Sequence, residues 1–295
     1  MPSIIIFRSK FLFSFLFLFL ISIISHAQSS IPFELTPQGH IMIKAKINGV
    51  EGNFIFDTGA GLTLITKTFS DKVGNLHKQD GSYTAFRATG EKLTADLYDA
   101  QTVTLGTFVE HNPVLTIFDA NLGPIDGLIS LMSFKEQPLT IDYTNKKIIF
   151  ETDKSMSDIR KSGRQIPLQL DESRDKALTI FTYFTVNNKL TLQFCIDSGA
   201  GANIYRINSR YITALGIDTA SASKIAIPSE FNPKLKTIIY NANVKSITAK
   251  ASPAIQCQNV KVSFIDGLIY DGILSLNWIG KQVTLDMKKR EMIVQ

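Results

Sequence analysis

The sequence is poor in the side chains on which many enzymes depend. Its 295 residues include two cysteines, four histidines and one tryptophan. The motifs H-E-x-x-H and G-x-S-x-G do not occur, and no two histidines have the spacing of metal ligands. These absences exclude a zinc-peptidase helix and the nucleophile turn of serine hydrolases. We predict no metal and no other cofactor.

The two cysteines, Cys195 and Cys257, allow at most one disulfide. Two buried thiols fit the sequence equally well, because a chain of this length builds a core without disulfides and free cysteine packs as a small apolar side chain. No histidine follows His111, so no base lies near Cys195 in the sequence. We interpret Cys195 as a buried strand thiol rather than a nucleophile.

A concentration of charge is also missing. The net charge is +5, and the basic residues are scattered, with no basic run interleaved with aromatic residues. A nucleic-acid-binding surface needs such a patch. We therefore predict no binding of nucleic acid.

Residues 1–27 have the pattern of a secretory signal peptide. Arg8 and Lys10 precede the apolar run FLFSFLFLFLISII, and small residues precede a predicted cleavage after Ala27. The run is shorter than the roughly 20 residues of a membrane-spanning helix, although an uncleaved anchor is the alternative. We predict a secreted or periplasmic protein with no stable membrane association after cleavage of the signal.

The rest of the chain repeats itself. Four landmarks recur in the same order, shifted by 135 to 145 residues: Ile31-Pro32 at Ile166-Pro167, Asp57 at Asp197, Asp126-Gly127 at Asp271-Gly272, and Asp142 at Asp286. Chance similarities would not stay collinear. We predict an N-terminal lobe over 28–150, an interlobe linker over 151–165 and a homologous C-terminal lobe over 166–295.

The sequence pattern of both lobes is typical of β-structure. Apolar segments flank short turn signals, 41–47 and 50–56 around Asn48-Gly49, and 178–186 and 190–196 around Asn187-Asn188. Helical patterns are weak and confined to 66–73 and 209–215. We predict an all-β fold in which each of the two homologous lobes is a β-barrel or a β-sandwich.

Each lobe places one acidic residue directly after an apolar strand. Asp57 lies in FIFDTGAG and Asp197 in FCIDSGAG. Gly59 and Gly199 let the chain turn sharply after the acid, so that backbone N–H groups can point at the carboxylate. Small residues in both turns allow the two loops to approach closely. Two carboxyls about 3 Å apart share one proton, and such a pair acts as general acid and base on a bound water.

This repeated pattern resembles the aspartic proteases of the pepsin and retropepsin type, in particular bacterial members that carry a signal peptide. The resemblance covers the chain after the signal, lobe by lobe, and it implies two homologous β-barrel lobes with an active-site cleft between them. It implies that Asp57 and Asp197 are the catalytic pair and that Thr58 and Ser198 brace the two loops. It also implies a supporting role for four glycines of the catalytic loops and the strands behind them, Gly59, Gly199, Gly127 and Gly272.

The resemblance further implies a hairpin flap over the cleft, which we place at 86–91, with Phe86, Thr89 and Gly90 as substrate-binding residues. Two features depart from the family. Gly61 and Gly201 stand where pepsin-like sequences often have a hydroxyl residue that supports a carboxylate. The flap tyrosine is not identified, and Tyr83 and Phe86 are its candidates.

We interpret the other repeated acids as structural. Asp126 and Asp271 are expected to accept hydrogen bonds from backbone at the start of a strand, and Asp142 and Asp286 to belong to hairpins. The competing Gly267 is set aside in favour of Gly272, because the distance from Gly272 to Asp286 matches that from Gly127 to Asp142.

The sequence predicts an aspartic endopeptidase that acts on peptide or protein substrates as a monomer. Two alternatives stay open. One is a non-catalytic bilobal peptide-binding protein, which the missing hydroxyls favour. The other is a protease that is active only as a homodimer.

Overall fold

The structure is a computed structural model, and it describes residues 28–218, 222–228 and 236–295. The predicted signal peptide, residues 1–27, lies outside the described residues. Strands predominate and form three large sheets and one hairpin. The prediction of an all-β fold is confirmed. Among the described residues no helix has both the length and the apolar character to cross a membrane.

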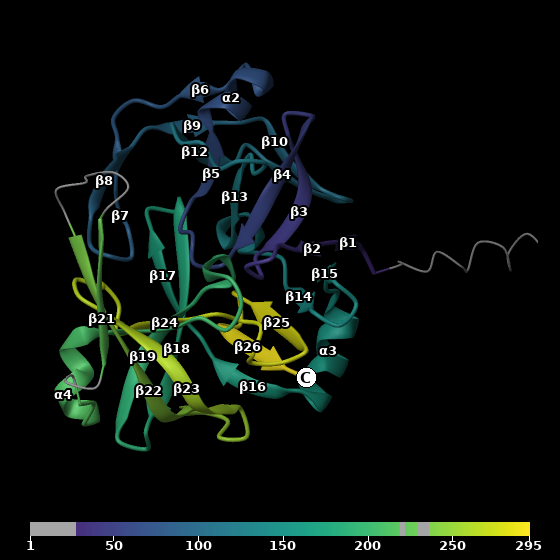
Figure 1. The fold of residues 1–295 in the computed structure, drawn as a ribbon. Helices are drawn as coiled ribbons and strands as arrows, with labels where there is room; N and C mark the ends of the chain where they lie inside the picture. Colours follow the sequence, from purple (N-terminus) through teal and green to yellow (C-terminus); the bar gives the residue numbers. More distant parts are fainter. Residues whose placement is uncertain (1–27, 219–221, 229–235) are drawn as a thin grey trace, which may run out of the picture.

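The first large sheet, which we call the first lobe, has ten strands in the order β11-β10-β3-β4-β13-β5-β12-β9-β6, with β2 paired to β3. Its strands are β2 (Glu34–Leu35), β3 (Ile41–Ile47), β4 (Val50–Asp57), β5 (Thr63–Thr66), β6 (His77–Lys78), β9 (Leu97–Asp99), β10 (Thr102–Leu105), β11 (Phe108–His111), β12 (Val114–Phe118) and β13 (Gly127–Ser130). Helix α2 (Lys67–Val73) and the 3-10 turn η1 (Leu131–Phe134) pack against it. The separate hairpin β7 (Tyr83–Phe86) and β8 (Lys92–Ala95) projects from this lobe (Figure 1).

The second large sheet, the second lobe, has eight strands in the order β17-β18-β19-β24-β20-β23-β22-β21. Its strands are β17 (Gln169–Ser173), β18 (Ala177–Val186), β19 (Leu190–Ile196), β20 (Tyr205–Asn208), β21 (Ser223–Pro228), β22 (Lys236–Ala249), β23 (Gln256–Ile265) and β24 (Gly272–Leu274), with the short helical turns η2 (Ser198–Ala200), η3 (Ser209–Tyr211) and α4 (Ile212–Leu215). An additional pairing of β18 with β22 closes six of these strands into a ring.

The two predicted hairpins form where the sequence places them. Ile47 pairs with Val50 across Asn48-Gly49, and both turn residues have positive φ, as a tight hairpin turn requires. In the second lobe Val186 pairs with Leu190 across a loop of one residue more, 187–189, and Asn187 and Asn188 both have φ of 53°. The side chains of β3 alternate between buried and more exposed positions, so its apolar residues face the core of the first lobe.

The third sheet joins the two halves of the chain. Its order is β1-β15-β14-β25-β26-β16, from β1 (Ser30–Pro32), β14 (Leu139–Asp142), β15 (Lys147–Phe150), β16 (Arg164–Pro167), β25 (Gln282–Asp286) and β26 (Glu291–Val294). The central pair, β14 and β25, comes from different halves. Thr140 lies opposite Thr284 there, with their buried hydroxyls 2.7 Å apart. This sheet connects both lobes within one chain and lies beside them in Figure 1.

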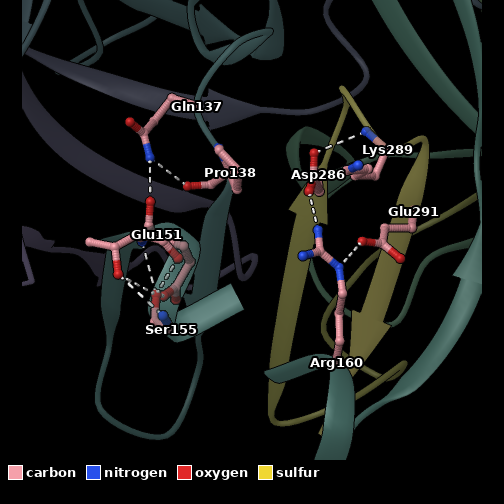
Figure 2. A network of polar contacts seen from close by, with 9 residues as sticks. Gln137, Pro138, Glu151, Ser155, Arg160, Asp286, Lys289 and Glu291 are labelled. Atoms are coloured by element: carbon pink, nitrogen blue, oxygen red, sulfur yellow. Dashed lines mark hydrogen bonds and ion pairs between the residues drawn. The ribbon is translucent and has the colours of Figure 1, made fainter. Parts of the chain in front are cut away.

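The segment predicted as an interlobe linker contains regular structure. Helix α3 (Asp153–Ser162) fills most of it, with Thr152 and Ser155 forming a reciprocal cap at its start. Arg160 on this helix donates to Asp286 and to Glu291, at 2.5 Å each (Figure 2). The helix was missed because its composition is polar. Its capping pattern was the available signal.

Candidate active site

The two loops that follow β4 and β19 are held by the same strand arrangement. In the first lobe β13 runs parallel to β4, with Gly127 opposite Phe54. In the second lobe β24 runs parallel to β19, with Gly272 opposite Phe194. A Cβ on Gly127 would lie 2.1 Å from the Leu64 carbonyl oxygen. A Cβ on Gly272 would lie 2.3 Å from the Phe194 ring. Both glycines are therefore required by close packing behind the loops.

The acids before these glycines have structural roles, as predicted. Asp126 accepts a hydrogen bond from the backbone N–H of Asn53 at 2.8 Å, and Asp271 accepts one from the backbone N–H of Gln193 at 3.1 Å. Asp271 also pairs with Arg210. Each acid anchors the strand next to its own.

Two hydroxyl side chains lock the loops together across the lobe boundary. The backbone N–H of Thr58 donates to Ser198 Oγ at 3.0 Å, and the backbone N–H of Ser198 donates to Thr58 Oγ1 at 2.9 Å. Each hydroxyl then donates to a carbonyl of the opposite lobe, Thr58 to Ile196 at 2.6 Å and Ser198 to Phe56 at 2.7 Å. Both hydroxyl residues are fully buried. The structure thus places these two residues where they brace the loops.

Each loop glycine packs against the acid of the other lobe. A Cβ on Gly59 would lie 2.5 Å from Asp197 Cγ, and a Cβ on Gly199 would lie 2.2 Å from Asp57 Cγ. No side chain other than hydrogen fits at either position. This mutual packing brings the two carboxyls together within one chain, 140 positions apart in the sequence.

The surroundings of the two carboxyls differ. Asp57 Oδ1 accepts the backbone N–H of Gly59 at 2.8 Å and that of Ala60 at 3.0 Å. Asp197 Oδ1 is buried and has no hydrogen-bond partner among the described residues. The first carboxyl is thus better stabilised as an anion than the second.

The pKa values of the pair follow from these surroundings. Burial raises the pKa of Asp197 well above its ordinary value, and the adjacent Asp57 carboxylate raises it further. Burial also raises the pKa of Asp57, but its backbone donors and a hydrogen bond from Asp197 oppose that effect. Burial and the neighbouring carboxylate thus both favour the protonated form of Asp197, and the two carboxyls titrate as a coupled pair.

Segments of the opposite lobe fill the space beside the two departures from the family, Gly61 and Gly201. A Cβ on Gly61 would lie 3.7 Å from Thr179 Oγ1, and a Cβ on Gly201 would lie 3.4 Å from His40 Nε2. His40 Nδ1 is held 3.2 Å from Thr36 Oγ1, and a positive charge on His40 lowers the pKa of Asp57. The sequence analysis missed both His40 and Thr179, because their partners come from the other half of the chain.

The segment predicted as a flap forms the turn of the β7–β8 hairpin. Its turn closes with the N–H of Gly90 donating to the carbonyl of Arg87 at 2.8 Å, and Gly90 has φ of 83°. The tip reaches the second lobe, where the N–H of Ile269 donates to the carbonyl of Ala88 at 2.9 Å. The carbonyl of Thr89 lies against Gly267, 3.2 Å from the position of a Cβ there. The hairpin thus spans from one lobe to the other.

A pocket of about 390 Å³ lies between this hairpin and the first catalytic loop. Tyr83 and Phe86 of the hairpin both line it. Tyr83 is buried against Leu62 and Leu97, whereas the Phe86 side chain is largely exposed. Of the two candidates for the flap aromatic residue, Tyr83 has the fixed position.

Among the described residues no cluster of histidine, cysteine and acidic side chains has the arrangement of a metal site. Cys195 is a buried thiol and Cys257 a half-buried one. Burial raises the pKa of Cys195 well above its ordinary value, and both dyad carboxylates raise it further. Its thiol therefore stays protonated and is a poor nucleophile.

The all-β fold and the two adjoining carboxyls agree with the predicted resemblance to aspartic proteases. Residues 43–132 match a family model described as aspartyl protease. The match includes the first catalytic loop and Gly127, and it confirms the resemblance to pepsin- and retropepsin-like aspartic proteases. A search of curated proteins finds no match.

Proposed function

We propose that this protein is an aspartic-type endopeptidase that hydrolyses peptide bonds with a water activated by Asp57 and Asp197. The observation that carries the proposal is the mutual packing of each carboxyl against the loop glycine of the other lobe. A single polypeptide thereby supplies both halves of the site, which supports activity as a monomer.

In the proposed reaction a water binds between the two carboxyls. Asp57, the ionised partner, removes a proton from the water as its oxygen attacks the substrate carbonyl carbon. The proton on Asp197 stabilises the developing oxyanion. The C–N bond then breaks as the amide nitrogen takes a proton from the pair, and the products are a free carboxyl and a free amine. No covalent intermediate with the enzyme forms.

The lack of supporting hydroxyls at positions 61 and 201 does not leave Asp57 unsupported, since two backbone N–H groups hold it. This favours a catalytic pair over a peptide-binding site without turnover. The substrate would lie extended under the β7–β8 hairpin and pair with its backbone, as an added strand does. Transport out of the cytoplasm through residues 1–27 is part of the same proposal.

The test uses purified protein that starts at Gln28, incubated with a defined peptide mixture between pH 3 and pH 7. Mass spectrometry of the products should show internal cleavage, with a maximum on the acidic side where only one carboxyl is ionised. Asp57→Asn and Asp197→Asn should each lower the rate by at least about a thousandfold. Cleavage that survives both substitutions would contradict the proposal. A sizing column run with the same activity assay tests whether the active species is a monomer.

A further inference from the structure

Each lobe contributes a set of side chains to the cleft from equivalent positions in its strands, and the set from the second lobe includes a charged residue. In the first lobe Ile65 of β5 lies opposite Gly127, and in the second lobe Ile207 of β20 lies opposite Gly272. The preceding residues, Leu64 and Arg206, therefore occupy equivalent positions.

The first wall is apolar. Leu64 lies opposite Thr116 on β12 and Leu128 on β13, and Phe118 follows two residues after Thr116. These four residues, which we call the first wall, all line the pocket beside the first catalytic loop. These four residues suit an apolar side chain of the substrate, and Asp171 of the second lobe lines the same pocket.

The second wall consists of the equivalent residues Arg206, Ser263, Ile265 and Ile273. Arg206 lies opposite Ser263 and Ile273, so these side chains share one face of the sheet. Ile265 and Ile273 pack in a cluster with Ala200 of the catalytic loop and Ala88 of the flap tip. This face is therefore turned toward the cleft.

Arg206 is the charged residue of the second wall. Its side chain is half-buried, and no carboxylate among the described residues forms an ion pair with it. The nearby charged group is Asp197, whose pKa the guanidinium lowers. Because the guanidinium has no hydrogen-bond partner among the described residues, its donors remain available to a further carboxylate.

The neighbours of Arg206 are also more polar than those of Leu64. Asn241 lies opposite Ser263 and accepts a hydrogen bond from its hydroxyl at 2.8 Å. The equivalent position in the first lobe is Leu97, which lies opposite Thr116. A half-buried guanidinium among hydrogen-bonding side chains is suited to binding a carboxylate.

We propose that Arg206 makes the second wall a recognition site for a substrate carboxylate, so that the enzyme prefers peptides with Asp or Glu on one side of the scissile bond and an apolar residue on the other. An extended peptide that crosses the approximate twofold axis at the dyad places the two residues flanking the scissile bond over opposite walls. This inference rests on the proposed function and specifies its substrate class.

The experiment compares four peptides that share an alanine-rich frame and contain Phe-Glu, Phe-Gln, Glu-Phe or Gln-Phe at the centre. In one of the two orders the wild-type kcat/KM for cleavage between the central residues should favour Glu over Gln roughly tenfold at pH 5.5. The preference should disappear below about pH 4, where the substrate carboxyl is protonated. Arg206→Leu, which copies the first wall, should abolish the preference, and Arg206→Lys should retain part of it.

Two outcomes would overturn the inference while the proposed function stands. One is equal cleavage of the Glu and Gln peptides in both orders by the wild type. The other is an equal loss for both peptides in Arg206→Leu, which would limit Arg206 to positioning or electrostatic support of Asp197. Thermal melts of both variants check that they fold, and Arg206→Gln replaces Arg206→Leu if the latter does not.

A binding measurement keeps the two proposals distinguishable if the wild type cleaves nothing. Fluorescence anisotropy with labelled versions of the four peptides, on Asp57→Asn and on Asp57→Asn/Arg206→Leu, reports recognition without hydrolysis. Tighter binding of a Glu peptide that depends on Arg206 supports the recognition site even without turnover. Equal binding of all four peptides overturns it.

Discussion

The loops that carry Asp57 and Asp197 are packed in the same way, but their carboxyl groups have different electrostatic surroundings. Thr58 and Ser198 exchange equivalent hydrogen bonds, and each loop glycine packs against the opposite acid. Yet Asp57 Oδ1 receives two backbone N–H groups, whereas Asp197 Oδ1 has no partner among the described residues. Similar packing in the two loops therefore brings the carboxyls together, whereas the hydrogen-bond partners of the two carboxyls differ.

The largest expected effect tests the packing of each loop glycine against the acid of the other lobe. Gly59→Ala and Gly199→Ala should each lower kcat/KM by at least about 100-fold, because either methyl group would overlap the opposite carboxyl and separate the pair. Gly61→Ala is the matched control in the same loop, since its methyl group would lie 3.3 Å from Ala177 Cβ and touch neither acid. Full activity of either glycine variant would show that the two loops do not depend equally on this packing.

The next effect concerns stability. Thr58→Val and Ser198→Ala should each lower the free energy of unfolding by about 2–3 kcal/mol, because each leaves a buried N–H of the opposite loop without its acceptor. Urea denaturation measures both variants and the double variant. The double variant should lose clearly less than the sum of the two, since both residues belong to one network. Additive losses would contradict the coupled arrangement.

A smaller effect should separate the two acids. The pKa of Asp197 is raised in the folded state. Its carboxyl therefore lowers the free energy of unfolding at pH values above the pKa that it has in the unfolded chain, and has no such effect below that pKa. Asp197→Asn should therefore raise Tm by a few degrees at pH 7, where about 1 kcal/mol corresponds to roughly 2–4 °C. Asp57→Asn should gain less, because its carboxylate is stabilised by backbone donors. At pH 3 both differences should vanish. Equal gains at pH 7 would indicate that the proton has no preferred side.

The smallest expected effect concerns His40 and Thr179, which each lie beside a glycine of the opposite loop. His40→Asn should move the acid limb of the kcat/KM profile slightly to higher pH, because a protonated His40 lowers the pKa of Asp57. Thr179→Val, at the equivalent place beside Gly61, removes no charge and should leave that limb unchanged. A shift of the same size in both variants would assign the effect to packing rather than charge.

Several features were predictable because their signals are local. The hairpins at Asn48-Gly49 and Asn187-Asn188, helix α2 and the turn at Gly90 follow from short-range rules of turn and cap chemistry. Helix α3 had a local signal too, the reciprocal cap of Thr152 and Ser155, but its polar composition suggested a linker.

Apart from helix α3, the features that escaped prediction depend on contacts between distant segments. The groups beside Gly61 and Gly201 come from the other lobe, and neither Thr179 nor His40 has a motif that marks it. The sequence around Arg206 predicts an ordinary strand residue. The strand register shows that Arg206 occupies the position equivalent to that of Leu64 in the first lobe.

The sequence by itself determined that two acids follow two apolar strands in matching turns, because strand period, turn glycines and repeated order are properties of neighbouring residues. How near those acids lie, how their hydrogen-bond partners differ and which residues of the two lobes occupy equivalent positions became clear from the three-dimensional structure alone. Those properties arise from burial and from partners far away in the chain, and electrostatic interactions depend on distance in space rather than on distance along the sequence.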